Sequence, residues 1–397
     1  MCAVQKLPTI RLKAGESRRI ERGHPWIYAN EIEMAGDART MQPGELTNVV
    51  NRNGTFVAIA MFNRNSLIAG RVLTHNAAAE VDESFIAARL RAALELRERF
   101  FDAPYYRLIH SESDGLPGLV IDRFGDALVL QFNTAGMDRL GEVVVAVVES
   151  MLAPSTIVLR NDSAVRDLEG LESTVVVVRE GRDAIELTEG GVCFNINATG
   201  GQKTGWYFDQ RPARDLVAPL CADQRVLDAY CYVGSFALRA VRAGATHATA
   251  IDNSLNAIER AEANALANGL DQRCSFVRGN VFKELEARVR AGERYDMVIC
   301  DPPAFIKSRK TRAAGLRGYR KLARLAAQLV EPGGLLFIAS CSHLADPPSF
   351  GVEVRAGLGG AERSGRIVAA GGAGTDHPVH PQLPESAYLK WQLLSLD

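Results

Sequence analysis

The sequence predicts an α/β protein of several domains, whose C-terminal half forms a Rossmann-like, doubly wound parallel sheet. With 397 residues, the chain is longer than a single hydrophobic core usually supports. After residue 192, strand-like and helix-like segments alternate, which is the pattern of a parallel sheet covered by helices on both faces. Before residue 192, strand-like runs dominate and only two stretches have helical character.

Residues 1–75 are expected to form a small β-rich domain. Pro43-Gly44 and Asn53-Gly54 are turn signals that separate short runs with strand character. These runs are residues 7–12, 44–50, 56–62 and 66–73. A cluster of basic residues in this domain is a candidate for binding phosphates: Arg11, Lys13, Arg18, Arg19 and Arg22.

Residues 76–190 are expected to form a central α+β domain. It opens with a connecting helix at 81–101, where apolar residues recur at helical spacing. A second helix-like stretch covers residues 137–151. The strand-like runs are residues 118–122, 127–131, 155–159 and 174–179.

Residues 191–397 are expected to hold the doubly wound sheet. In open sheets of this kind, ligands bind beyond the carboxyl ends of the strands, so the residues after each strand are the candidates for chemistry. The strand-like runs are residues 225–228, 246–252, 274–278, 295–300 and 335–339, and the helix-like runs are 234–243, 254–268 and 313–330.

The composition is that of a soluble enzyme, with 47% hydrophobic and 23% charged residues. No apolar run approaches the roughly 20 residues that a membrane-spanning helix needs, and the stretch from Met1 to Ile20 is too polar for a secretory signal. The seven cysteines are scattered without a CxxC pair, which argues against a disulfide framework and a zinc site. We therefore expect a cytoplasmic protein with no membrane partner and no metal.

Three successive strand ends carry residues suited to an adenosyl ligand. Asp228 and Gly234 lie in a turn with one glycine, which differs from the dinucleotide pattern GxGxxG. Asp252 ends the second strand, where a carboxylate can accept both ribose hydroxyls, and Asn280 follows the third strand in reach of an adenine. Either aspartate alone would more often be a helix cap, but the ordered set favours a nucleotide.

The fourth strand ends in Asp301, followed by Pro302 and Pro303. The prolines cannot continue the strand ladder and stiffen the loop, so Asp301 is held at the strand tip, where it can bind the edge of a flat base. Phe305 is a candidate for stacking on that base. A plain strand-terminating turn is the competing interpretation.

A strongly basic run follows this loop. Between Pro302 and Val330 there are eight basic residues and no acidic ones. Such a run is usually a solvated helix face, but its place directly after the proposed substrate loop favours contacts with phosphates. The eight residues are Lys307, Arg309, Lys310, Arg312, Arg317, Arg320, Lys321 and Arg324.

Cys341 lies just past the fifth strand, between Ser340 and Ser342. A lone cysteine is more often inert and buried, but this position at the ligand-binding edge suits a nucleophilic thiolate. Cys300 is a weaker candidate because it belongs to an apolar strand, and Cys231 is expected to be a packing residue.

Taken together, these features resemble the bacterial large-subunit (23S) ribosomal RNA cytosine-5 methyltransferases, and the similarity extends over almost the full length. Lys13-Ala-Gly and His24-Pro25-Trp26 look like that family's PUA RNA-binding domain. Further matching segments are residues 110–118 and 122–125 in the central domain, 203–211 before the catalytic domain, and 376–378 and 383–390 near the C-terminus.

The resemblance implies a class I methyltransferase domain that binds S-adenosylmethionine, with residues 203–211 covering the cofactor. It implies that Cys341 attacks the base and that the partner is large-subunit ribosomal RNA. We expect Asp301 to steady the base through its N3 and amino edge. The implied cofactor contacts are Phe208, Asp209, Gln210, Arg211, Asp228, Tyr230, Gly234, Ser235, Phe236, Asp252, Asn253, Asn280, Val281 and Asp301. The implied RNA contacts are Pro302, Pro303, Phe305, Lys307, Arg309, Lys310, Arg18 and Arg19.

The chain departs from the family pattern in two places. A glycine-rich stretch over residues 345–360 replaces the family's helix after the cysteine, and Asn280 stands where an acidic residue is common. The segments 376–378 and 383–390 are expected in the closing antiparallel strands.

Two other functions stay open from the sequence. Methylation of a ring or exocyclic nitrogen would suit the Asp-Pro-Pro loop, although Ala304 intervenes before the aromatic Phe305. A non-catalytic RNA-binding assembly factor is the alternative from another class, against which the intact cofactor residues argue. The oligomeric state is not determined, and a homodimer is considered.

Overall fold

The computed structural model describes residues 7–181, 185–200 and 204–397, and the chain divides by its internal contacts into two compact units. Segments far apart in the sequence contribute to each of them. The first unit comprises Met1–Ile185, Ile196–Trp206 and Thr375–Ser386, and the second comprises Glu186–Asn195, Tyr207–Gly374 and Ala387–Asp397.

The first unit begins with a six-stranded sheet in the order β2-β6-β5-β4-β1-β3. All four predicted strands of this region are present, but β6 begins only at Gly70. The preceding residues instead form a turn, in which Asn63 N donates to Ala69 O over 2.8 Å. The elements are β1 (Thr9–Leu12), α1 (Ser17–Glu21), β2 (Trp26–Ile27), β3 (Ile32–Glu33), β4 (Glu45–Val50), β5 (Phe56–Phe62) and β6 (Gly70–Thr74).

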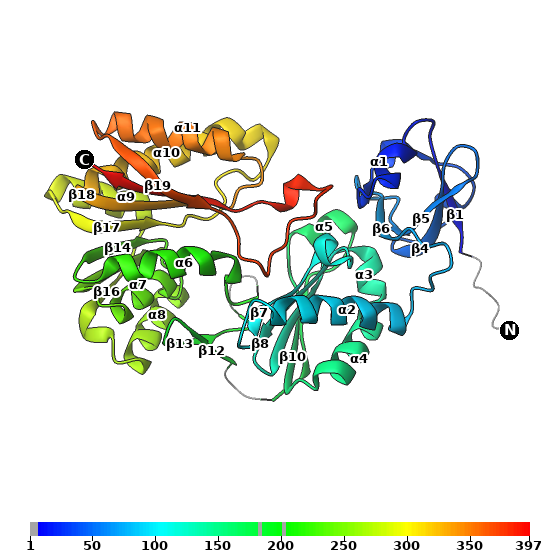
Figure 1. Ribbon diagram of the computed structural model, residues 1–397, viewed down its shortest axis with the longest axis horizontal. Coiled ribbons are helices and arrows are strands. Elements are labelled where there is room, and N and C mark those ends of the chain that lie inside the picture. Colours follow the sequence, from blue (N-terminus) through cyan, green and yellow to red (C-terminus); the bar gives the residue numbers. More distant parts are fainter. Residues whose placement is uncertain (1–6, 182–184, 201–203) are drawn as a thin grey trace. The chain divides into compact units, whose positions relative to one another are not determined.

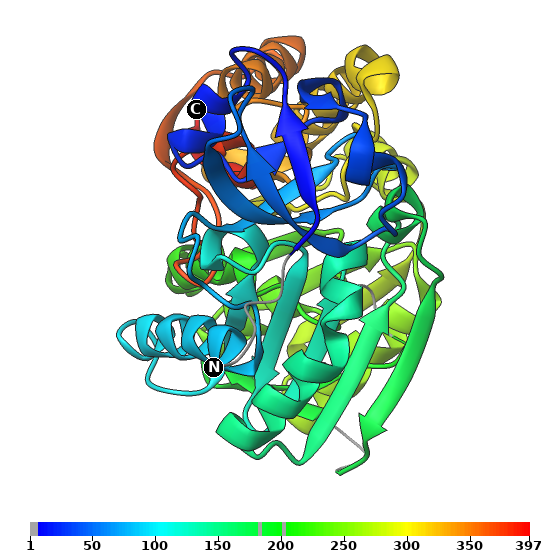
Figure 2. The same cartoon turned by 90° about the vertical axis from the view of Figure 1, so that its right-hand side faces the viewer.

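A five-stranded sheet in the order β11-β10-β9-β8-β7 follows in the same unit. The predicted helix over 137–151 is divided at Leu140 into two helices, and β7 was not predicted. Figure 2 shows β11 at the edge of this sheet, where its four valines are partly exposed. The elements are α2 (Glu83–Glu98), β7 (Tyr105–His110), β8 (Leu119–Phe124), β9 (Ala127–Phe132), α3 (Ala135–Arg139), α4 (Gly141–Leu152), β10 (Thr156–Asn161), α5 (Val165–Glu169) and β11 (Thr174–Arg179).

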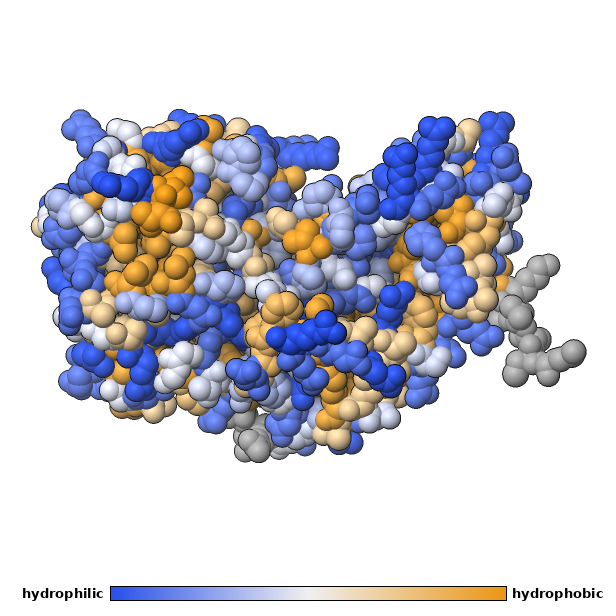
Figure 3. Space-filling model, viewed as in Figure 1, coloured by the Kyte–Doolittle hydropathy of each residue, from blue (hydrophilic) through white to orange (hydrophobic). Residues whose placement is uncertain are grey.

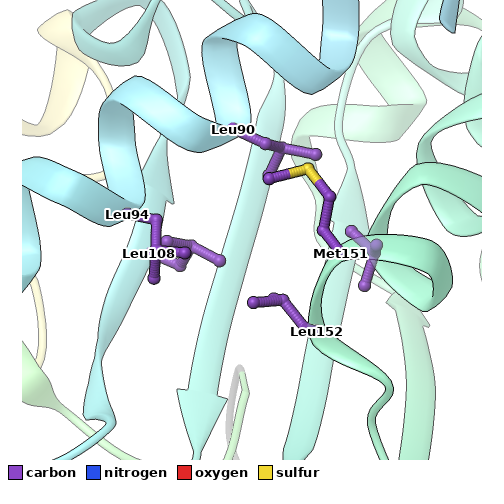
Figure 4. Close-up of a pocket in the computed structure, with 6 residues that line it drawn as sticks. Leu90, Leu94, Leu108, Met151 and Leu152 are labelled. Atoms are coloured by element: carbon purple, nitrogen blue, oxygen red, sulfur yellow. The ribbon is translucent and has the colours of Figure 1, made fainter.

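Helices α2 and α4 contribute to the apolar core that covers this sheet. Asp82 caps α2 by accepting a hydrogen bond from Phe85 N over 2.9 Å, as expected for a helix that starts at this point. Figure 4 shows leucines of α2 and β7 facing Met151 and Leu152 of α4 around a small pocket. All six side chains that line it are apolar, so they would not orient a polar ligand.

A two-stranded hairpin, β12 (Ile185–Glu189) and β13 (Val192–Ile196), precedes the doubly wound sheet and was not predicted. Its turn residues Gly190 and Gly191 have φ angles of 58° and 74°. Such angles suit a two-residue hairpin turn. The usual sequence signal for this turn is a pair of glycines between two runs in which apolar and polar residues alternate.

The second unit contains a seven-stranded sheet in the order β16-β15-β14-β17-β18-β20-β19. Strands β14 to β18 pair in parallel, which confirms the predicted doubly wound sheet, and β20 is antiparallel to both of its neighbours. The strands are β14 (Arg225–Ala229), β15 (His247–Asp252), β16 (Cys274–Arg278), β17 (Tyr295–Cys300), β18 (Val330–Ser340), β19 (Gly365–Gly371) and β20 (Lys390–Leu396).

Helices cover both faces of this sheet (Figure 1). Helices α9, α10 and α11 lie over one face, and α6, α7 and α8 lie over the other. Figure 3 shows apolar side chains over the edge strand β19, in which Ile367 and Val368 are half exposed. None of the helices in the described ranges has both the length and the apolar character that crossing a membrane requires. The helices are α6 (Arg211–Val217), α7 (Ser235–Arg242), α8 (Leu255–Ala267), α9 (Val281–Ala291), α10 (Arg312–Leu329) and α11 (Pro347–Gly360).

Two expectations about the C-terminal region were wrong. The glycine-rich stretch after Cys341 was expected to replace a helix, but it forms the helix α11. Asp346 caps this helix by accepting a hydrogen bond from Ser349 N over 2.7 Å. Gly357 permits close packing on α10, because a Cβ there would lie 2.6 Å from Ala323 Cβ. The closing antiparallel strands exist, but residues 376–378 and 383–389 lie between them, and only Lys390 belongs to a strand.

Candidate active site

Five parallel strands of the second unit end at one edge of the sheet, and each carries a predicted site residue at or just after its end. Asp228 is the residue before the last in β14, and Asp252 ends β15. Asn280, Asp301 and Cys341 follow β16, β17 and β18. The strand ends, which follow one another along the chain, are therefore also neighbours in space.

The turn after β14 is held in a strained conformation. Tyr230, Tyr232 and Gly234 have φ angles of 69°, 51° and 82°, and only glycine adopts this region without cost. The backbone N–H groups of Tyr230 and Cys231 both donate to Ile251 O, at 2.9 and 3.0 Å. These bonds fix the turn against β15.

The carboxyl group of Asp228 is fully buried and only half satisfied. Its Oδ2 accepts a hydrogen bond from Ala237 N, in the first turn of α7, over 3.0 Å. Its Oδ1 has no partner among the described residues. Burial raises the pKa of Asp228 to about 7, and the nearby carboxylates of Asp301 and Asp252 act in the same direction. A cationic hydrogen-bond donor would complete this site.

Asp252 organises the loops on both sides of it. One carboxylate oxygen accepts from Tyr232 N over 3.1 Å, and the other accepts from Ser254 N over 2.9 Å. Ser254, not Asp252, caps α8, since its hydroxyl accepts from Ala257 N. The helix-cap interpretation therefore does not describe Asp252.

The other predicted contacts near these strands differ in exposure. Asn280 is exposed, and its Oδ1 caps α9 by accepting from Lys283 N over 3.2 Å. Val281 and Phe236 are buried in the packing around the sheet, the latter with its ring centroid 5.4 Å from that of Phe337. Asn253 is exposed, and Tyr230 and Ser235 are half buried.

The segment predicted to cover the cofactor includes a short 3-10 helix, Phe208–Gln210, that leads into α6. All three of its residues are buried, and Arg211 lies over the Phe208 ring at 5.1 Å. Gln210 Nε2 donates to Asp301 Oδ1 over 2.7 Å, which joins this segment to the end of β17. Lys203, which belongs to the predicted segment, lies outside the described residues.

A buried ionic cluster that the sequence did not reveal supports this segment. Glu189 of β12 accepts from Arg214 over 2.6 Å and from Arg239 over 2.8 Å, and it pairs with Arg211 at 3.3 Å. Arg214 also donates to Tyr207 O over 3.0 Å. Burial acts to raise the pKa of Glu189, but the three guanidinium groups together lower it to about 2.

The loop after Asp301 contains Pro302, which is buried, and Pro303, which is exposed. Phe305 is half buried, with its ring 4.7 Å from that of Tyr319 and 5.9 Å from that of Phe282. This packing competes with the predicted stacking of Phe305 on a base.

Cys341 is half buried, and the two serines beside it are tied to one tyrosine of α10. Ser340 Oγ donates to the Tyr319 hydroxyl over 2.8 Å, and the Tyr319 and Ser342 hydroxyls lie 2.8 Å apart. The Cys341 thiol points toward Pro302 O at 3.8 Å. Cys300 and Cys231 are buried, and burial raises the pKa of both thiols, so neither is suited to be a thiolate.

Three of the eight residues of the basic run have charged partners within the protein. Arg312 pairs with Asp346, Arg320 with Glu353 and Lys321 with Glu286. In the part of the chain that the structure describes, four exposed residues form no ion pair: Lys307, Arg309, Lys310 and Arg317. In the first unit, Arg18 is exposed, whereas Arg19 pairs with Glu31 at 2.7 Å.

The order of the sheet and the residues at its carboxyl edge define a class I S-adenosylmethionine-dependent methyltransferase. Residues 160–360 match the family described as S-adenosylmethionine-dependent methyltransferase, and residues 10–75 match a PUA-like domain. A Klebsiella pneumoniae protein named ribosomal RNA large subunit methyltransferase I is 35% identical over 96% of this chain and 97% of its own length. A Photobacterium profundum protein of the same name is 34% identical over 96% of this chain and 98% of its own length.

The chain belongs to the ribosomal RNA large subunit methyltransferase I family, as the resemblance predicted. Solved structures agree with the predicted fold. A candidate SAM-dependent methyltransferase from Streptococcus mutans superposes with a TM-score of 0.82 at 19% identity, covering 98% of this chain and all of that one. The SMU.776 structure, complexed with SAH, gives a TM-score of 0.84 at 19% identity with the same coverage of this chain.

The cofactor of the family is S-adenosylmethionine, and the residues at the sheet edge fit it. Asp228 offers a buried oxygen without a partner to a cationic donor such as the amino group of the cofactor's amino acid tail. Gln210 Oε1 is also buried without a partner among the described residues. The role of Asp252 as acceptor of ribose hydroxyls stays a prediction.

Proposed function

We propose that this protein methylates C5 of a cytosine in large-subunit ribosomal RNA and that Cys341 is the covalent nucleophile. The class of RNA is inferred from the names of the relatives, and the chemistry is inferred from the residues of the site. Its main support is the approach of the Cys341 thiol to the carbonyl of Pro302, at 3.8 Å. That contact brings the nucleophile to the loop that begins with Asp301.

Carbon methylation needs a nucleophile because C5 of cytosine has no lone pair to offer. The thiolate of Cys341 adds to C6, and the electron pair this releases makes C5 nucleophilic. The bound cofactor supplies the methyl group. A base then takes the C5 proton, the C6–S bond breaks, and the thiolate is restored.

Asp301 has the role of steadying the base through its amino edge. The hydrogen bond from Gln210 Nε2 to Asp301 Oδ1 orients the carboxylate, and the buried Pro302 fixes the backbone after it. The target cytosine has to leave its stack to enter the site, which costs a few kcal/mol and least in a loop. An unpaired region of the RNA is therefore the expected substrate.

The test uses RNA that carries 5-fluorocytosine, because fluorine at C5 blocks the final elimination and traps the adduct. Wild-type protein should form a denaturation-resistant complex whose crosslinked peptide contains Cys341. Cys341→Ala should form none and should transfer no methyl group, while it still binds the cofactor. Cys274→Ala is the matched control, since Cys274 begins β16 at the opposite edge of the sheet and should leave the adduct unchanged.

Methyl transfer by Cys341→Ala at the wild-type rate would contradict the proposal and favour methylation at a nitrogen. An adduct that maps to Cys300 would keep the chemistry but change the nucleophile. Failure of the wild-type protein to bind S-adenosylmethionine would favour an assembly role without catalysis.

A further inference from the structure

Lys390 is a buried cation beside the cysteine loop. It is the first residue of β20 and pairs with Ser340, which ends β18. Its side chain is 6% exposed. The ammonium donates to Ser342 O over 2.6 Å and to Tyr388 O over 2.8 Å, so it bridges the residue after Cys341 and the segment that leads into β20.

Both acceptors of this ammonium are neutral carbonyls. Among the described residues, Lys390 has no carboxylate within ion-pair distance. A buried ammonium without a counter-charge is costly and shifts toward its neutral form. Burial accordingly lowers the pKa of Lys390 to about 8, while Asp346 and a charge on Cys341 act to raise it. A thiolate at Cys341 would supply the missing counter-charge.

The other charged and titratable groups around this pair do not replace the lysine. Asp346, at the start of α11, is paired with Arg312 at 3.3 Å. Tyr207 and Tyr319 couple electrostatically to Cys341, and burial raises the pKa of both, so they stay neutral. Asp301 and any charge on Cys341 repel each other. His343, next in the loop, lies with its ring 5.2 Å from that of Tyr388.

We propose that Lys390 is the positioning residue that keeps Cys341 in its thiolate form and its loop in place. This inference rests on the proposed function of Cys341 as a nucleophile. The thiol proton passes to solvent, Lys390 keeps its own proton, and the resulting thiolate and ammonium stabilise each other. The two bonds to carbonyl oxygens hold the ammonium at the residue that follows the cysteine.

The test measures the rate at which iodoacetamide alkylates Cys341 as a function of pH, in the full-length protein without RNA or cofactor, by mass spectrometry of the cysteine peptide. In the wild type, the apparent pKa of Cys341 should lie below the value of about 8.5 for a free thiol. In Lys390→Met, it should rise by about one unit, so that alkylation near neutral pH slows about tenfold. Lys390→Arg should stay near the wild type because it keeps the charge.

Lys283→Met is the matched control, since Lys283 is an exposed lysine of α9 and should leave the profile unchanged. The inference is overturned if Lys390→Met has a native circular dichroism spectrum and its alkylation rate depends on pH as that of the wild type does. If Lys390→Met does not fold, the wild-type value decides: an apparent pKa at or above about 8.5 also overturns it.

The failure of this inference and that of the proposed function are distinguishable. Trapping with 5-fluorocytosine together with an unchanged alkylation profile in Lys390→Met would refute the role of Lys390 and leave Cys341 as the nucleophile. A shifted profile without any trapped adduct would support the coupling of Lys390 to Cys341 and refute the covalent mechanism.

Discussion

Asp228 accepts a hydrogen bond from the backbone N–H of Ala237 over 3.0 Å through one carboxylate oxygen, while its other oxygen is buried without a partner in the described structure. The protein therefore carries a destabilising group at the proposed cofactor site. Ligand binding can satisfy that group, so stability and cofactor affinity are coupled there.

The first prediction is that Asp228→Asn stabilises the cofactor-free protein at pH 8 but weakens cofactor binding. The folded-state pKa of Asp228 is raised to about 7 from 3.8, so its contribution to stability is fully present below about pH 4 and is lost as pH rises through 7. The resulting loss in the free energy of unfolding is at most about 4 kcal/mol. Thermal unfolding at pH 5 and pH 8, with and without S-adenosylmethionine, measures it.

In that experiment, the difference in melting temperature between the variant and the wild type should be larger at pH 8 than at pH 5. An equal difference in melting temperature at pH 5 and pH 8 would show that Asp228 does not titrate between these two pH values. Unchanged cofactor affinity would remove it from the binding site.

The second prediction is that Asp252→Ala weakens cofactor binding by about 1.5–3 kcal/mol, because it removes a charged acceptor of ribose hydroxyls. It also removes the bonds from Tyr232 N and Ser254 N, so the turn after β14 should loosen. Isothermal titration calorimetry gives the affinity, and Asp271→Ala, in the short 3-10 helix before β16, is the control. Equal affinities of Asp252→Ala and the wild type would assign Asp252 to loop structure only.

The third prediction concerns the stability that Glu189 provides. Its folded-state pKa is lowered to about 2 from 4.5, so its contribution is present above pH 4.5 and is lost as pH falls toward 2. Glu189→Gln leaves Arg214 and Arg239 without their shared carboxylate and should cost about 3–5 kcal/mol at pH 7.

Urea unfolding at pH 7 and pH 3 measures this cost, which should shrink at the lower pH. Glu186→Gln is the matched control, because Glu186 lies on the exposed side of the same strand. If both variants lose the same stability, the arginine cluster does not account for the effect.

The fourth prediction concerns contacts with RNA and rests on the proposed substrate. Replacing both Arg309 and Lys310 by Gln should reduce the slope of log affinity against log salt by about 1.5, as expected for two lost phosphate contacts. Lys321→Gln should change the slope little, because Lys321 already pairs with Glu286 at 2.8 Å. Fluorescence anisotropy with a ribosomal RNA fragment at several salt concentrations provides both slopes, and equal effects of the two changes would argue against this surface.

The sequence by itself determined the doubly wound sheet and the edge that carries the site. Alternation of strand-like and helix-like segments defines a parallel sheet, and the ends of parallel strands meet at one edge. Asp228, Asp252, Asp301 and Cys341 could therefore be proposed from their places after strands alone. The strand ends also indicated an adenosyl ligand and a nucleophilic thiolate, and the family motifs added S-adenosylmethionine and the cytosine as the base. The domain boundaries at residues 75 and 190 and the individual site contacts stay predictions.

Only the tertiary structure decided which groups surround these residues. Tyr319, Glu189 and Lys390 are far from Cys341 or Asp228 in the chain, and no local pattern marks them, because their partners are brought near by packing between helices, a hairpin and an antiparallel strand. The helix α11 was missed for the same reason. Its glycines weaken helical propensity, yet Gly357 lets it pack closely on α10, and burial against that neighbour outweighs the local preference.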